Sequence, residues 1–362
     1  MSDGLVDSAQ ELAEVCRQID DATHVALDTE FIRQRTYRPQ LCLIQIAVGD
    51  NIYCVDPLAF DDLSDLMNRL NKVEVVIHSA RQDLEAIYQT TGVMLAPVFD
   101  TQIAAGLTGL GDQISYSALV DELLEVELDK GETRTNWAQR PLTAAQKRYA
   151  EDDVRYLLQL YAPLRERLGQ QSRTEWLEAE CAALGDVALY EPDPDSSWSR
   201  VKGTRGLTRA QRRGMKRLAA WRERQAWDKD RPRKWIISDE DIITLASQEP
   251  KSPEDLAGLL DSKQRYLRQA SAELFEQLQL AEEDPLEPPF SGHDPDEVKL
   301  IKTGMAMVRS AATKSAISPS LLGTRKDVIK VIRGEASALL ETWRRELIGQ
   351  ELQQAVAKPQ ES

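Results

Sequence analysis

The fold is decided by residues 23–48, whose sequence is THVALDTEFIRQRTYRPQLCLIQIAV. The apolar run at 25–27 predicts a buried strand, and this strand ends in the acidic residues Asp28 and Glu30. Side chains two apart on a strand share a face, so both carboxylates point to one place while Thr29 points the other way. Like charges that converge beside apolar residues are costly unless a cation lies between them. Because oxygen ligands favour magnesium or manganese, the sequence predicts a divalent-metal site here.

Further strands and helices surround this stretch. Strands are predicted at 41–48, 52–55 and 73–77, and helices at 8–20, 61–70, 101–107, 115–126 and 143–168, with one more starting near Asp83. Thr143 is the predicted N-cap of the last and longest of these helices. Strands followed by interleaved helices predict an α/β domain with a mixed sheet.

Length and composition predict an ordinary globular protein of two or three domains, with 362 residues, 42% hydrophobic and 29% charged. No apolar run reaches the roughly 18 to 20 residues of a membrane span, and the N-terminus lacks a signal-peptide pattern. The four cysteines are scattered and form no Cys-x-x-Cys pair, which predicts reduced, buried thiols. We therefore expect a cytoplasmic protein.

The charge is unevenly distributed along the chain. The net charge is −15, yet residues 200–234 hold 14 Lys or Arg against 3 Asp or Glu, a local balance of 14 − 3 = +11. Tryptophans at 198, 221, 227 and 235 are interleaved with these cations. The pattern predicts RNA contacts from Arg212, Arg213, Lys216 and Arg217. The same four residues also fit a solvated helix face. Trp221 and Trp343 fit a helical core better than they fit platforms for base stacking.

Tyr149 and Asp153 lie four residues apart on the last predicted helix of the first half, so they share a face. Asp152 lies three residues from Tyr149 and is the competing candidate. The four-residue spacing favours Asp153. His78 fits a hydrogen-bonded residue at a strand end better than a metal ligand.

Together these residues resemble a known family. Asp28-x-Glu30 on a first strand, Asp83 at the head of a helix and Tyr149-x-x-x-Asp153 on a late helix resemble the three motifs of the DEDD exonuclease superfamily, in its tyrosine-bearing branch. Asp-Thr-Glu-Phe at 28–31, then Arg33, Thr36-Tyr37, Pro39 and Leu-Ile-Gln at 43–45, resemble the ribonuclease D family more narrowly. The likeness covers about residues 5–170.

The second half resembles the same family. Leu218-x-x-Trp221-Arg222-Glu223-x-x-Ala226 is similar to the helicase-and-RNase-D C-terminal (HRDC) domain, and residues 323–326 and 343–349 resemble its diverged second copy. The resemblance implies a ribonuclease-H-like α/β domain followed by two small all-α domains. We expect an exonuclease domain at 1–184, a linker at 185–206, an HRDC domain at 207–284 and an HRDC-like domain at 285–362.

The resemblance also implies site roles. Asp28, Glu30 and Asp153 would hold one metal that activates the attacking water, and Asp28 would bridge to a second that stabilises the leaving 3′ oxygen. Asp83 would support the second metal, and Tyr149 would orient the water. Phe31 would stack against the terminal bases, and Gln45 would contact the terminal nucleotide.

The expected function is therefore metal-dependent 3′-to-5′ exoribonuclease action on tRNA precursors and other structured RNAs, with release of 5′ mononucleotides. Two divalent ions, magnesium or manganese, are the expected cofactors, and RNA is the expected partner of a monomeric protein. A DNA exonuclease and a non-catalytic RNA-binding protein on the same scaffold are the alternatives. The absence of helicase and polymerase motifs favours RNA over DNA, and the complete carboxylate set favours an enzyme over a binding protein.

Overall fold

A computed structural model of the protein describes residues 5–128, 135–285 and 295–357. The chain divides into two compact units. Unit 1 comprises Met1–Ile32, Leu41–Leu189 and Gly292–Ser362, and unit 2 comprises Arg33–Gln40 and Tyr190–Ser291. The chain therefore leaves unit 1 for residues 33–40, which the sequence did not predict.

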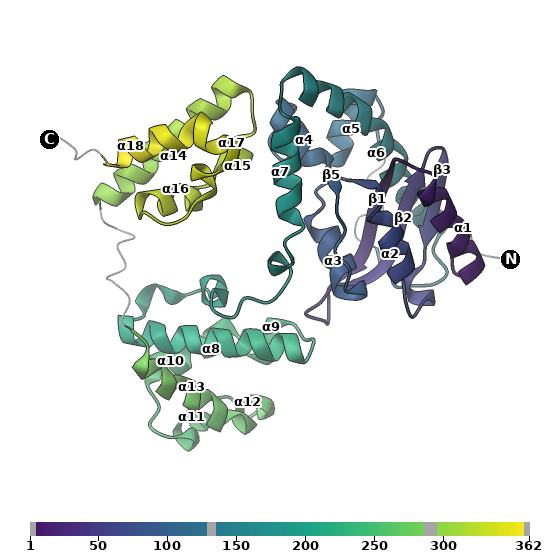
Figure 1. The fold of residues 1–362 in the computed structure, drawn as a ribbon. Helices are drawn as coiled ribbons and strands as arrows, with labels where there is room; N and C mark the ends of the chain where they lie inside the picture. The colour runs from purple at the N-terminus through teal and green to yellow at the C-terminus, as the bar shows by residue number, and fades with distance from the viewer. Residues whose placement is uncertain (1–4, 129–134, 286–294, 358–362) are drawn as a thin grey trace. The chain divides into compact units, whose positions relative to one another are not determined.

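A five-stranded sheet forms the centre of unit 1 (Figure 1). Its strands are β1 His24–Ile32, β2 Gln40–Val48, β3 Asn51–Val55, β4 Glu74–Ile77 and β5 Val98–Asp100, in the order β3-β2-β1-β4-β5. β2 and β3 are antiparallel, whereas β4 is parallel to both β1 and β5. The predicted mixed sheet is confirmed. The strand β5 was missed, because three residues are too short to show an alternating pattern.

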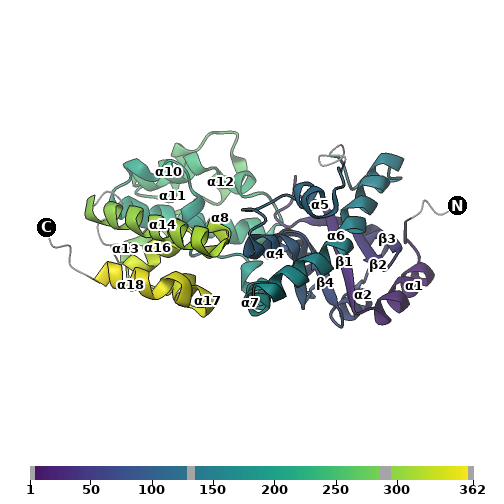
Figure 2. The ribbon, with the colours of Figure 1, turned by 90° about the horizontal axis from the view of Figure 1, so that it is seen from above.

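Helices cover both faces of this sheet. Every residue from Leu41 to Val48 is buried, which requires a covering layer on each side of β2. Figure 2 shows α1 and α2 on one face and α6 on the other. The helices of this part are α1 Ala9–Asp20, α2 Ser64–Leu70, α3 Arg81–Thr91, α4 Thr101–Thr108, α5 Tyr116–Leu124, α6 Ala144–Gln170 and α7 Thr174–Leu184, with the 3₁₀ turns η1 Pro57–Ala59 and η2 Val187–Leu189.

Local signals account for the ends of two of these elements. Gly49 has φ +56°, the left-handed conformation of a tight turn, and it joins β2 to β3. Thr143 caps α6 by accepting a hydrogen bond from the Gln146 amide, and the Gln146 side chain accepts one from the Thr143 amide in return. The predicted cap is confirmed, and α6 starts where the site requires it.

The last part of unit 1 is helical. It contains α14 Pro295–Ser315, α15 Pro319–Leu322, α16 Arg325–Ile332, η5 Ala338–Leu340, α17 Thr342–Arg344, the π-helical turn η6 Arg345–Gly349 and α18 Gln350–Ala357. Trp343 is buried, stacks on Trp176 of α7 at 4.9 Å between ring centroids, and donates from Nε1 to Glu180 at 3.0 Å. The Glu180 carboxylate also pairs with Arg344. These contacts join the C-terminal helices to the first part of unit 1.

Over its described residues, unit 2 contains helices and the segment Arg33–Gln40. Its elements are η3 Ser197–Arg200, η4 Thr204–Gly206, α8 Arg209–Asp228, α9 Arg233–Ile236, α10 Asp239–Gln248, α11 Pro253–Leu259, α12 Arg265–Gln269 and α13 Ser271–Glu283. Trp221 belongs to the core of this unit, and Trp343 is buried against Trp176, so the expectation that both tryptophans are packing residues is confirmed. Val201 and Trp198, from the predicted linker, also pack into this core.

All four cysteines are buried as thiols, as predicted. Over the described ranges, the chain has no helix with the length and apolar character that a bilayer crossing requires.

Candidate active site

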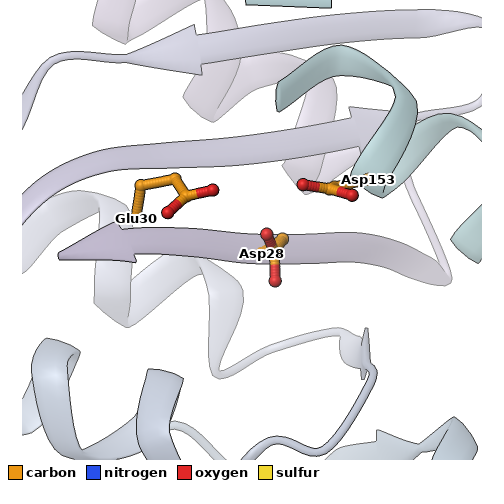
Figure 3. A group of neighbouring side chains, drawn as sticks. All are labelled: Asp28, Glu30 and Asp153. Atoms are coloured by element: carbon orange, nitrogen blue, oxygen red, sulfur yellow. The ribbon is translucent and has the colours of Figure 1, made fainter. Parts of the chain in front are cut away.

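Three carboxylates meet where β1 passes α6. One carboxylate oxygen from each of Asp28, Glu30 and Asp153 can be chosen so that all lie within 4.8 Å of one another. Figure 3 shows Asp28 and Glu30 on the strand and Asp153 on the helix, with the Glu30 and Asp153 carboxylates facing each other across Asp28. The two residues of β1 share a face because they are two apart, and α6 packs across that face against β1, β3 and β4. The predicted convergence of these three side chains is what the structure shows.

Asp152 does not belong to this group. Its side chain is 46% exposed and accepts a hydrogen bond from Arg155 Nε at 3.3 Å. The four-residue spacing from Tyr149, and not the three-residue one, therefore selects the carboxylate that faces β1.

The three carboxylates are strongly perturbed. Burial, and then the charge of Asp153, raises the pKa of Asp28 well above its ordinary value. Burial and the neighbouring charges of Asp28, Asp153 and Asp83 raise the pKa of Glu30 to about 10. For Asp153, burial and the charge of Asp152 raise the pKa to about 7, against the lowering effect of a hydrogen bond from Tyr149. The site concentrates negative charge that only protons or a cation relieve.

Asp83 lies beside this group, in the first turn of α3. It is buried, and its Oδ1 accepts a hydrogen bond of 2.6 Å from the Thr29 hydroxyl. The Thr29 hydroxyl thus holds Asp83 next to β1, close enough to the group for its charge to act on Glu30 and Asp153. Burial and then the Asp28 charge raise the pKa of Asp83 well above its ordinary value.

Tyr149 faces Asp153 from the preceding turn of α6. Its hydroxyl hydrogen-bonds to the Asp153 carboxylate, and its ring lies 6.1 Å from that of buried Trp137. Burial, followed by the charges of Asp153, Glu30 and Asp28, raises the pKa of Tyr149. The phenol therefore stays protonated and acts as a hydrogen-bond donor at neutral pH.

Tyr116 is a further residue of the site that no sequence pattern predicted. Its hydroxyl donates to the Asp152 carbonyl at 2.9 Å, and burial with the charges of Asp153 and Asp28 raises its pKa. It joins the start of α5 to the segment of α6 that carries Asp153, and no sequence spacing links the two helices.

His78 hydrogen-bonds to the Thr101 hydroxyl and the Ile114 carbonyl, which confirms it as a structural residue.

The two residues expected to contact the RNA near the site differ in their exposure. Phe31 is partly exposed at the end of β1. Gln45 is fully buried, and neither side-chain amide atom has a hydrogen-bond partner in the structure. A residue with no accessible surface does not touch a nucleotide, so the expected contact between Gln45 and the terminal nucleotide is withdrawn. The sequence placed Gln45 on the correct strand but could not show that helices cover it.

The four cations of α8 make contacts within unit 2. Arg212 donates to the Leu207 carbonyl, Arg213 to the carbonyls of Glu282 and Asp284, and Arg217 pairs with the Asp284 carboxylate. The ammonium of Lys216 lies 4.2 Å from the centre of the Trp198 ring. Part of the positive charge of this stretch therefore makes contacts that stabilise unit 2.

The donor set fits a metal. Carboxylate oxygens are the ligands that hard divalent cations prefer, and a cation would lower the perturbed pKa values of the carboxylates that face it. The arrangement is able to hold a divalent ion on one side of β1, with Tyr149 directed at the same space.

Comparisons with known proteins agree with this geometry. Residues 5–169 match the 3′-5′ exonuclease family, and residues 211–278 match the HRDC domain. The chain is 36% identical to ribonuclease D of Sphingobium indicum, over 96% of this chain and 92% of that protein, and 34% identical to ribonuclease D of Bartonella henselae, over 97% and 89%. The crystal structure of Escherichia coli RNase D, described as an exoribonuclease involved in structured RNA processing, superposes with a TM-score of 0.85 at 28% identity, covering 98% of each chain.

Proposed function

The chain belongs to the ribonuclease D family and is a metal-dependent 3′-to-5′ exoribonuclease, and we propose that it trims the 3′ ends of tRNA precursors and other structured RNAs. The product of each step is a 5′ mononucleotide. The observation that carries this proposal is the buried group of Asp28, Glu30 and Asp153, with Tyr149 bonded to its helical member.

Asp28, Glu30 and Asp153 are proposed as the metal ligands, with Asp83 as a supporting carboxylate. Two bound ions, magnesium or manganese, would compensate the negative charge on the entering and leaving oxygens of the phosphodiester. The chain itself supplies the orientation: Thr29 holds Asp83 and Tyr149 holds Asp153, so these two carboxylates have a fixed direction before the ions bind. Tyr149, protonated at neutral pH, is proposed to orient the attacking water by a hydrogen bond.

RNA binding is proposed to use unit 2 and the end of β1. In this proposal Phe31 stacks against the terminal bases. The positive charges of Arg212, Arg213, Lys216 and Arg217 attract the phosphate backbone of the RNA. Trp235 is 54% exposed and directly follows Arg233 and Lys234, which makes it available for stacking on a base.

We retain the cytoplasm as the proposed location, because buried thiols suit a reducing compartment, and we retain a monomer as the proposed state.

The substrate class is tested with matched RNA and DNA. A tRNA precursor with a short 3′ extension and a DNA of the same sequence are each labelled at the 3′-terminal nucleotide and incubated with manganese. We expect labelled 5′ mononucleotide from the RNA at a rate well above that from the DNA. A faster release from DNA would favour the DNA exonuclease alternative, and intact labels on both substrates with binding retained would favour the non-catalytic alternative.

A further inference from the structure

Residues 33–39 connect β1 to β2, and with Gln40, the first residue of β2, they belong to unit 2, while the rest of both strands belongs to unit 1. This connection begins three residues after Glu30. We propose that unit 2 positions the carboxyl end of β1 by holding this connection, so that Tyr37, Glu223 and Arg233 set the turnover of the catalytic site. The inference rests on the proposed function and assigns unit 2 a role beyond RNA binding.

The side chain of Tyr37 lies in a cluster of polar groups. Its hydroxyl donates to Oε1 of Glu223, and Arg233 donates from Nε and Nη2 to the two oxygens of the same carboxylate. Arg233 Nη2 also donates to the Tyr37 hydroxyl at 2.7 Å, and its guanidinium lies 4.5 Å from the centre of the Tyr37 ring. We call Tyr37, Glu223 and Arg233 the Tyr37 cluster.

The backbone of the connection is held as well. The amides of Tyr37 and Arg38 both donate to Oδ1 of Asp230, at 3.0 and 2.9 Å. The Arg38 guanidinium lies 3.9 Å from the centre of the Trp227 ring, and Tyr37 meets Trp227 edge-on at 5.6 Å. Contacts to two consecutive amides fix the path of the chain and not only the direction of a side chain.

Glu223 is the buried charge of the Tyr37 cluster and requires its hydrogen-bond partners. Its side chain is only 1% exposed, so an unpartnered carboxylate there would be strongly disfavoured. Burial acts to raise the pKa of Glu223, but hydrogen bonds from Arg233 and Tyr37 bring the pKa below its ordinary value. Glu223 is therefore ionised at neutral pH, and Tyr37 is one of the groups that stabilise the charge.

The site end of β1 depends on this connection. β1 pairs with β4 at His24, Val25 and Ala26, and Glu30 lies beyond these residues. The neighbour of β1 on its other side is β2, the strand that follows the same connection. Reacting groups that move by about 1 Å lose about 100-fold in rate. A loosened connection is thus expected to lower turnover by displacing Glu30 and Phe31, even where the RNA is still bound.

The test uses Tyr37→Phe, which removes one hydroxyl, and Glu223→Gln, which removes the charge. Each variant is compared with a matched control in unit 2: Tyr266→Phe, whose hydroxyl bonds to Gln225 and Lys229, and Asp239→Asn, whose carboxylate pairs with Arg222. The substrate is a short single-stranded oligoribonucleotide with a free 3′ end. Measured quantities are kcat, KM, the manganese concentration for half-maximal rate, and RNA affinity without metal.

We expect kcat to fall about tenfold in Tyr37→Phe and further in Glu223→Gln, with a higher manganese requirement and RNA affinity within about twofold of wild type. The double variant should lose less than the product of the two single losses, because both changes act on the same group of hydrogen bonds. Both controls should keep the wild-type kcat. If Glu223→Gln does not fold, the kcat of Tyr37→Phe alone tests the inference.

Two results would overturn the inference. One is an unchanged kcat in Tyr37→Phe, and the other is a loss confined to KM and RNA affinity, which would reduce the Tyr37 cluster to an RNA-binding or stabilising element. An inactive wild type would instead reject the proposed function, so the two failures are distinguishable.

Discussion

Asp28, Glu30 and Asp153 place three acidic groups in a buried space. Their ionisation lowers the free energy of unfolding, so the stability of the protein depends on pH. In the folded chain Glu30 keeps its proton up to a pKa of about 10, against 4.5 for its ordinary value. The folded state binds more protons than the unfolded state between these values, so the free energy of unfolding falls as pH rises through this window. Asp153, with a pKa of about 7, adds an effect of the same sign.

We therefore expect the melting temperature of the chelated protein to fall steadily from about pH 5 to about pH 9. Manganese should restore most of the loss, because a cation between the carboxylates replaces the protons. Glu30→Gln is the control and should flatten the slope. Melting curves that rise with pH under chelation would contradict the account of the charge cluster.

Tyr149 gives a second prediction for a single residue. Tyr149→Phe keeps the ring beside Trp137 but removes the hydroxyl that bonds to Asp153, and we expect kcat to fall about 100-fold while manganese still raises the melting temperature. Tyr161→Phe is the matched control on the same helix, because its hydroxyl bonds to Glu74. Equal activity of the two variants would remove Tyr149 from the catalytic assignment.

Among the elements, α6 carries Tyr149 and Asp153, and its start depends on the reciprocal bonds of Thr143 and Gln146. We expect Thr143→Ala to lower the free energy of unfolding by about 1 kcal/mol, measured by urea denaturation, because one buried amide loses its acceptor. Thr143→Ser should stay close to wild type. A neutral Thr143→Ala would show that packing alone fixes the start of α6.

Sequence patterns predicted most elements because their signals are local. The spacing of Asp28 and Glu30 on a strand, and of Tyr149 and Asp153 on a helix, depends only on the period of each element. That Asp153 joins the two strand carboxylates was expected from the family resemblance alone, and the structure brings the three together. Tyr116 and the burial of Gln45 depend on which elements pack together, and no local pattern carries that information.

On the scale of the whole molecule, long-range contacts decide the organisation. The sequence predicted three successive domains, and those boundaries stay a prediction. The structure groups the C-terminal helices with the sheet and groups residues 33–40 with the HRDC helices. The residues responsible, such as Glu180 and Tyr37, look like ordinary surface residues in the sequence, because their partners lie more than 150 residues away.

Glu180 tests this organisation. Its carboxylate is 16% exposed and pairs with Arg344, which is 12% exposed, so we expect Glu180→Ala to destabilise the docked C-terminal helices by about 3 kcal/mol. Hydrogen exchange should then quicken in α14 to α18 and remain slow in the sheet. Arg333→Ala, which breaks a more exposed pair with Glu297, is the control and should change exchange little. Equal protection in both variants would contradict the docking role of Glu180.

The central claim is that the carboxylates on β1 and α6 hold the metal that drives 3′-to-5′ hydrolysis. Its most direct test is a gel time course on a tRNA precursor labelled at its 5′ end, with manganese and with chelator, for wild type, Asp28→Asn and the exposed control Asp152→Asn. We predict a ladder that shortens one nucleotide at a time from the 3′ end in wild type and Asp152→Asn, stopped by chelator, and slowed more than about 100-fold in Asp28→Asn. A ladder of wild-type rate in Asp28→Asn, or one that persists under chelation, would contradict the claim.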